Sequence, residues 1–200
     1  MESEVQRVYK LTREDKTTYG GMKWGEGVTH EVGEWAQSNL EEPLCTSAWI
    51  HFYDHPLLAV LHNPVHANYK PFLLWEAEAR GPFKREEQMK GGCKSLTTIK
   101  IIEPPNVTPV NRVAYGIHCA LAVYEEKSFQ EWAEKWLTNK NRTALAPERW
   151  RWPWPWPYAA CAAYAAANAT AALAAANVAA YAAARRVDRI SLAEKALLVS

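Results

Sequence analysis

Residues 47–56, SAWIHFYDHP, hold the greatest concentration of chemically versatile side chains in this sequence. Between His51 and His55 lie two imidazoles, a phenol and a carboxylate, and all of these groups can move protons or bind a metal ion. The stretch is either part of an active site or the end of a strand that meets the capped start of a helix. Because alternate residues of a strand share a face, we take His51 and Tyr53 as candidate catalytic residues.

The histidines also have a spacing that metal-binding helices use. His51 and His55 are four residues apart, as are His62 and His66, and this spacing places two imidazoles on one side of a helix. One proline directly follows the first pair, however, and another lies inside the second. Proline interrupts helices, so neither pair is expected to share one continuous helix. The sequence therefore predicts no metal site.

The same prolines favour a structural role for this stretch. Pro56 suits the first position of a helix, and Asp54 or His55 suits the cap before it. We predict a helix over residues 56–62 that ends at Asn63–Pro64. On this interpretation the histidines are hydrogen-bonded structural groups.

A cysteine nucleophile is the next chemical candidate. Cys45 has a suitable atom, and Cys93 lies within GGCK (91–94), where the neighbouring ammonium would favour a thiolate. No nucleophile signature such as GxSxG is present, so a buried or turn cysteine is the preferred interpretation. The four cysteines form no CxxC pair, and residues 1–15 lack the apolar segment of a secretory signal. We expect reduced thiols in a cytoplasmic protein.

Alternation of apolar and polar residues predicts three strands, at 5–11, 72–79 and 95–102. Five of the nine glycines fall within 20–33, which we expect to form turns and loops without a phosphate-binding motif. These elements predict an α+β fold with a small antiparallel or mixed sheet.

Helical patterns dominate the second half of the chain. Residues 111–127 carry an apolar stripe, and FQEWAEKWL (129–137) carries a wide aromatic face that must be buried. Ser128 and Glu131 have the spacing of a capping box before this second helix. We therefore expect a helical C-terminal region beside the sheet, within a body that spans residues 1–145.

Two unusual segments follow this body. Residues 146–157 form a Trp/Pro-rich strap, because prolines that alternate with tryptophans exclude a helix and favour polyproline II. Residues 158–200 are predicted to form an Ala-rich helix packed on the body or on a partner. Its uncharged part, 158–184, contains asparagine and threonine, so we expect no transmembrane segment. The aromatic residues expected to bind a partner are Trp150, Trp152, Trp154, Trp156 and Tyr181.

Charge is distributed unevenly although the net charge is only +1. Residues 1–126 hold 13 Lys or Arg against 17 Asp or Glu, a balance of −4. Residues 127–200 hold 10 against 5, a balance of +5. An acidic body with a basic C-terminal arm can dock a nucleic acid, a membrane surface or the body itself.

The order of several segments resembles a family of uncharacterised bacterial and phage domains whose members often carry an Ala-rich tail. The resemblance rests on VYKLT, the Gly-rich loop, CTSAWIHFYDHPLLAVL, LLWEAEARG and KGGCKSLTTIKII. It spans roughly residues 8–126, and Ala48-Trp49 stands where a glycine is common in the family. More distantly, the same order is similar to small ADP-ribosyltransferase-like folds.

That second similarity implies NAD binding. It places His51 and Tyr53 against the nicotinamide or a base, and it makes Glu76 or Glu78 the late-strand carboxylate that stabilises an oxocarbenium-like transition state. The first strand offers Tyr9-Lys10 where such folds usually have His or Arg. The NAD-binding residues implied in this way are Tyr9, Lys10 and His51.

Three functions stay open from the sequence. The preferred one is a non-catalytic interaction protein, for example a phage-encoded inhibitor or a virion or assembly component, cytoplasmic or virion-associated, that binds a protein partner or forms a homo-oligomer. It is preferred because no catalytic motif is specific. The alternatives are an ADP-ribosyltransferase-like NAD-binding enzyme and a nucleic-acid-binding accessory protein that uses the basic arm and the tryptophans.

Overall fold

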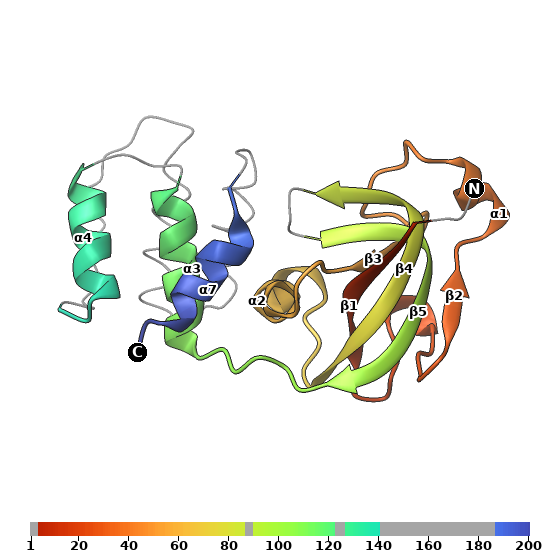
Figure 1. The fold of residues 1–200 in the computed structure, drawn as a ribbon, viewed down its shortest axis with the longest axis horizontal. Coiled ribbons are helices and arrows are strands. Elements are labelled where there is room, and N and C mark those ends of the chain that lie inside the picture. The colour runs from red at the N-terminus through yellow and green to blue at the C-terminus, as the bar shows by residue number, and fades with distance from the viewer. Residues whose placement is uncertain (1–3, 87–89, 123–126, 141–186) are drawn as a thin grey trace. The chain divides into compact units, whose positions relative to one another are not determined.

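The computed structural model describes residues 4–86, 90–122, 127–140 and 187–200. The chain divides into two compact units, Met1–Pro105 and Asn106–Ser200. A five-stranded antiparallel sheet and several helices confirm the α+β class (Figure 1). The boundary between the units falls inside the range 1–145 that the sequence suggests as one body. The Trp/Pro-rich strap and most of the Ala-rich segment lie outside the described residues.

The first unit is built on a long antiparallel hairpin. Strand β4 (Phe72–Glu86) pairs with β1 (Val5–Arg13) on one side and with β5 (Lys90–Ile102) on the other (Figure 1). The far side of β5 pairs with two short strands, β2 (Thr29–Glu31) and β3 (Ile50–Phe52). The three predicted strands are therefore present, and β4 and β5 are longer than their sequence patterns.

An isolated bridge between Tyr9 and Tyr53 joins the two ends of this sheet. Each backbone N–H donates to the carbonyl of the other residue at 2.8 Å. Strands β1, β4, β5 and β3 therefore form a ring that this one bridge closes, and the bridge pairs the edges of β1 and β3 at that point. Val8, Trp24, Phe52 and Leu96 belong to the apolar cluster inside it.

Two glycines at the start of β5 permit β3 to approach closely. A Cβ at Gly91 would lie 2.4 Å from the Phe52 ring, and one at Gly92 would lie 2.5 Å from Leu44 Cδ1. GGCK therefore forms part of a strand, and the side chains of Phe52 and Leu44 occupy the space that Cβ atoms at Gly91 and Gly92 would take.

Helix α2 (Pro56–His66) begins where the sequence predicts and ends later. Pro56 is at the first turn, and the His55 side chain accepts a 3.3 Å hydrogen bond from the Leu57 N–H. The predicted stop at Asn63–Pro64 is wrong, because the helix passes through Pro64. The proline lies in the last turn, where the Asn63 carbonyl accepts from Ala67 N at 3.0 Å and closes the helix.

The extension of α2 also corrects the expectation about the second histidine pair. His62 and His66 do lie on one helix, with ring centroids 5.4 Å apart. His66 is consequently carried next to Tyr53, which the sequence did not predict. Two further short elements lie in the first unit, the turn η1 (Tyr19–Gly21) and α1 (Glu34–Ser38).

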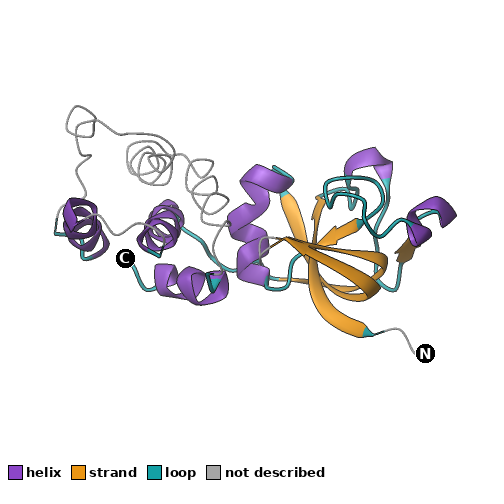
Figure 2. Ribbon diagram, turned by 90° about the horizontal axis from the view of Figure 1, so that it is seen from above, coloured by secondary structure: helices purple, strands orange, loops and turns teal. Residues whose placement is uncertain are grey.

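The second unit is helical in its described part (Figure 2). It contains α3 (Pro109–Leu121), α4 (Lys127–Leu137) and α7 (Arg189–Leu197). The aromatic face predicted for α4 is buried, as Phe129, Trp132 and Trp136 show.

Helix α7 begins with its own cap, because the Asp188 side chain accepts from Ser191 N at 3.2 Å and the Asp188 backbone is extended. The helix expected over 158–200 therefore does not run unbroken to the C-terminus. Within the described ranges, no helix combines the length and apolar character needed to cross a membrane.

Candidate functional site

The chemically interesting residues of the first unit surround one cavity of about 580 Å³. Its walls come from β1, η1, the end of β2, the loop before β3, β3 itself, the end of α2 and the start of β5. A volume of this size suits a small molecule or one functional group of a larger partner. The titratable residues that line it are Lys10, Tyr19, Glu31, Cys45, His51, Tyr53, His66, Tyr69 and Lys90.

Lys10 contributes a buried cation to the wall. Its Nζ donates a 2.7 Å hydrogen bond to the His51 carbonyl and lies 5.0 Å from the centroid of the Trp24 ring. Burial lowers the pKa of Lys10 from 10.5 to about 8, because water no longer stabilises the charged form. No carboxylate among the described residues forms an ion pair with this ammonium. At neutral pH Lys10 is thus mainly a cation without a counter-ion in this part of the chain.

His51 is held in the wall by its neighbours and is neutral. Its Nε2 is hydrogen-bonded to the Leu44 carbonyl. Burial is the main reason that the pKa of His51 falls to about 4, and the nearby charges of Lys10 and Lys90 lower it further.

His66 has the same character. Its Nδ1 is hydrogen-bonded to the Tyr53 hydroxyl at 3.2 Å, and the two rings are stacked with their centroids 5.9 Å apart. Burial lowers the pKa of His66 to about 3, and His62, Lys90 and His51 lower it further. Burial also raises the pKa of Tyr53, so the phenol stays protonated.

Cys45 and Lys90 form a contact at the cavity. Lys90 Nζ lies 2.8 Å from Cys45 Sγ, although the two residues are 45 positions apart. Cys45 is exposed and free, whereas Cys93 is buried in the strand. Burial raises the pKa of Cys93 to about 12, so this thiol is not a nucleophile.

The electrostatic character of the cavity is positive. Two lysines face two neutral imidazoles whose pKa values are lowered partly by those lysines. Among the described residues of the wall, Glu31 is the single carboxylate. An anion in the cavity would be attracted by the two lysines and would offset their positive charge.

The carboxylates that the sequence suggested for catalysis lie elsewhere. In the β1–β4 register, Tyr9 is opposite Glu76 while Lys10 is opposite Trp75, so Glu76 shares the face of Tyr9. Glu76 forms ion pairs with Arg7 at 3.2 Å and Lys100 at 3.8 Å.

Glu78 lies on the same face, opposite Arg7, and contacts Arg80 at 3.9 Å. Neither glutamate lines the cavity, and Tyr9 does not line it either. Of the proposed NAD-binding residues, Lys10 and His51 are brought together there.

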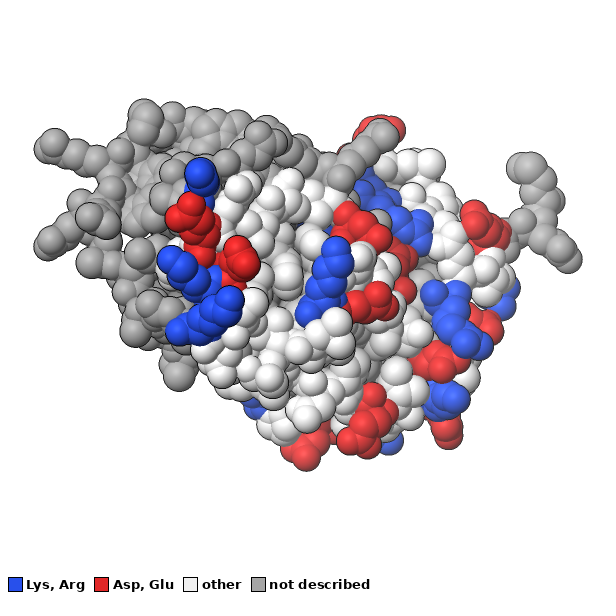
Figure 3. All heavy atoms as spheres, turned by 60° about the vertical axis from the view of Figure 1, so that its left-hand side comes forward, with Lys and Arg blue, Asp and Glu red and all other residues white. Residues whose placement is uncertain are grey.

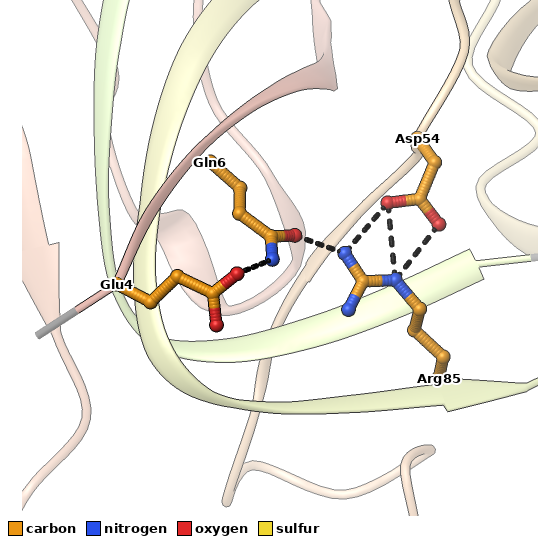
Figure 4. A network of polar contacts seen from close by, with 4 residues as sticks. All are labelled: Glu4, Gln6, Asp54 and Arg85. Atoms are coloured by element: carbon orange, nitrogen blue, oxygen red, sulfur yellow. Dashed lines mark hydrogen bonds and ion pairs between the residues drawn. The ribbon is translucent and has the colours of Figure 1, made fainter.

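Asp54 has a structural role. The Arg85 guanidinium contacts both carboxylate oxygens of Asp54 at 2.9 to 3.2 Å and also bonds Gln6, which in turn donates to Glu4 (Figure 4). This network joins β1, β4 and the segment that follows β3. Asp54, the carboxylate of SAWIHFYDHP, is therefore ion-paired with Arg85.

Several cavity residues were not identified from the sequence, namely Glu31, His66, Tyr69 and Lys90. His66 could have been found from its pairing with His62 if the proline had been allowed in the last turn. The other three are isolated residues in unremarkable local patterns. The expected partner-binding residues, Trp150, Trp152, Trp154, Trp156 and Tyr181, lie outside the described part of the chain.

Two further properties bear on the alternatives. The described residues contain no group of three or more His, Cys, Asp or Glu that could hold a metal ion. On the face drawn in Figure 3, Lys and Arg are interspersed with Asp and Glu, and the described residues show no broad area of one sign there.

The comparisons with known proteins add no family to this picture. No family model matches the sequence, and no curated protein or solved structure shows significant similarity to it.

Proposed function

We propose that the first unit is a non-catalytic recognition module that binds an anionic group in the cavity between β1, β3 and the end of α2. The observation that carries this proposal is the buried Lys10 ammonium, which has no carboxylate counter-ion among the described residues and faces the same cavity as Lys90. A buried cation is costly unless a charge of opposite sign joins it. A carboxylate or phosphate group supplies that charge.

The hydrogen bonds of the wall support binding rather than catalysis. His51 is hydrogen-bonded to a backbone carbonyl, and Tyr53 is hydrogen-bonded to His66. A general base needs a pKa near the working pH, and both imidazoles are far below it. These side chains shape the wall, while the two lysines provide the charge.

The aromatic rings of the cavity indicate the rest of the ligand. Tyr19 and Tyr69 lie with centroids 5.5 Å apart, and Tyr19 is 67% exposed. Tyr69 is buried, so the ring that a ligand can reach is that of Tyr19. An exposed ring beside a cationic site favours a planar or apolar portion next to the anionic group. The anionic group therefore belongs to a small organic acid or phosphate, or to the acidic side chain of a protein partner.

NAD-dependent transfer receives less support. The reaction implied by the similarity needs a carboxylate beside His51 and Tyr53, whereas Glu76 and Glu78 are on the other face of β4 and are ion-paired. Glu31 is the carboxylate that does line the cavity, and it lies at the exposed end of the short strand β2.

The test is isothermal titration calorimetry of the full chain with inorganic phosphate, citrate and, in a separate arm, an acidic peptide. We expect Lys10→Met and Lys90→Gln each to lower the affinity for the anion about tenfold, which is about 1.4 kcal/mol of binding free energy. Lys100→Gln is the matched control, because this lysine pairs with Glu76 on the other face.

The arms distinguish the sources of the anion. Tight binding of phosphate or citrate indicates a small-molecule ligand, and binding of the peptide alone indicates a protein partner. Equal weakening by Lys100→Gln would show general charge attraction and would refute the proposal. Release of nicotinamide from NAD by the purified chain would refute the non-catalytic part.

A further inference from the structure

The contact between Cys45 and Lys90 is closer than an ordinary hydrogen bond to sulfur. The 2.8 Å between Sγ and Nζ is the length of an N–H···O bond, about 2.9 Å, although sulfur is much larger than oxygen. Cys45 belongs to the loop between α1 and β3, and Lys90 is the first residue of β5. The fold thus brings a thiol and an amine from distant segments into contact beside the cavity.

We propose that Cys45 and Lys90 form a reversible, oxidation-dependent covalent crosslink in which one oxygen atom bridges Sγ and Nζ. An oxygen bonded to both atoms spans the observed separation with little movement of either segment. A direct sulfur–nitrogen bond would require the two atoms to come much closer.

Cys45 is the cysteine that an oxidant reaches first among those described. Its side chain is exposed, whereas Cys93 and Cys119 are buried. Burial raises the pKa of Cys93 and of Cys119 to about 12, so both stay as unreactive thiols. Among the described cysteines, Cys45 is therefore the one whose sulfur is accessible to a peroxide and touches an amine.

The reaction is balanced with two equivalents of hydrogen peroxide, each of which accepts two electrons. The first peroxide transfers one oxygen to the thiol, which becomes a sulfenic acid, and its other oxygen leaves as water. The Lys90 ammonium releases a proton to solvent, and the second peroxide then transfers one oxygen to the neutral amine, which becomes a hydroxylamine, while the other oxygen leaves as water. Condensation of the S–OH and N–OH groups forms the S–O–N link and releases a third water. Two equivalents of a dithiol return the four electrons and regenerate the thiol, the amine and one water.

The crosslink has a consequence for the cavity, and this consequence rests on the proposed function. Lys90 loses its ammonium charge when its nitrogen is bonded to oxygen. The loop that carries Cys45 also becomes fixed to β5 at the wall of the cavity. Oxidation is therefore expected to weaken anion binding, and reduction to restore it.

The test is intact-mass and peptide-mapping mass spectrometry of the full chain after treatment with hydrogen peroxide. We expect a gain of one oxygen less two hydrogens, located in a crosslinked peptide that contains both Cys45 and Lys90, and its loss after dithiothreitol. Cys45→Ser and Lys90→Arg should each abolish this crosslinked peptide. Lys100→Arg leaves Cys45 and Lys90 unchanged and should still form it.

Other products would overturn the proposal. Oxygen atoms added to Cys45 with Lys90 unmodified, at the same rate in Lys90→Arg, would show ordinary thiol oxidation. Loss of two hydrogens without added oxygen would show a direct sulfur–nitrogen bond. Absence of any product that dithiothreitol reverses would show that the pair does not react.

Anion binding is then measured separately, before and after oxidation. If the crosslink forms but the reduced protein binds no phosphate, citrate or acidic peptide, the proposed function fails and the crosslink stands. If the reduced protein binds an anion and no crosslink forms, the crosslink fails alone.

Discussion

Lys10 and His51 are joined by a 2.7 Å hydrogen bond from the lysine ammonium to the histidine carbonyl, which ties β1 to β3 through a buried cation. The bond fixes the ammonium at the wall of the cavity and leaves the His51 imidazole to contact Leu44. One backbone carbonyl does not neutralise a positive charge, so the site is ready for an anion.

Anion binding should depend on the protonation of Lys10. Its pKa of about 8 in the free protein means that the ammonium is present below that pH and is lost above it. We therefore expect a nearly constant affinity from pH 6 to 7 and a decline above about pH 8, measured by calorimetry with citrate. The decline should be absent in Lys10→Met. A decline of the same size in that variant would assign it to another group.

Acid should destabilise the fold through His66. Its pKa is about 3 in the folded chain and 6.5 ordinarily, so between these values the unfolded chain binds a proton that the folded chain does not. The linkage relation then makes stability fall as the pH drops from about 6.5 towards 3. In urea denaturation at several pH values, His66→Gln should lose less stability over this window than the wild type. An equal loss of stability in His66→Gln and the wild type would assign the acid dependence to another group.

Gly91→Ala should disrupt the pairing of β3 with β5. The added Cβ would lie 2.4 Å from two atoms of the Phe52 ring, which is itself fully buried. Overpacking of this kind costs about 1–3 kcal/mol, measurable as a lower midpoint of chemical unfolding. Gly33→Ala is the matched control, because a Cβ there meets nothing within 4 Å. A Gly91→Ala variant as stable as Gly33→Ala would show that β3 can move aside freely.

Lys94→Met should loosen the loop that carries Cys45. The Lys94 ammonium donates to the carbonyls of Ala36 at 2.6 Å and Ala48 at 2.9 Å, and it lies 3.6 Å from the Trp49 ring centroid. Methionine fills the space but leaves these carbonyls without a donor, at a cost of about 3 kcal/mol.

Hydrogen exchange should accelerate in residues 36–48 of this variant. It should not change there in Lys23→Met, where an exposed lysine is replaced. Unchanged exchange in Lys94→Met would show that the loop is held by other contacts.

Asn111→Ala should detach α7 from α3. The Asn111 side chain donates to the carbonyls of Ala196 at 2.9 Å and Val199 at 3.0 Å, and it also completes the capping box with Thr108. Loss of these bonds should lower stability by about 2 kcal/mol. Limited proteolysis should cleave the C-terminal residues faster than in Gln130→Ala, where an exposed glutamine of α4 is replaced. Equal rates would assign the docking of α7 to its apolar contacts.

Local sequence patterns predicted the elements whose signals are contained in short windows. The alternation in β1, β4 and β5, the aromatic stripe of α4 and the entrance at His55–Pro56 are of this kind. Strand β2 lies in the Gly-rich region predicted as loops, because three residues are too few to show alternation. The predicted end of α2 is too early, because it treats Pro64 as a helix stop. The Asn63 carbonyl accepts a hydrogen bond from Ala67 N, so the helix continues past the proline.

The sequence by itself therefore determined the α+β class, the main strands and the face of β1 that carries Lys10 away from Tyr9, since these depend on residue periodicity. Tertiary structure alone decided that β1 and β3 close the sheet, that Glu76 and Glu78 face away from the cavity, and that Cys45 meets Lys90. Strand register and loop path bring together residues more than 40 positions apart, and no local pattern of side chains encodes that distance.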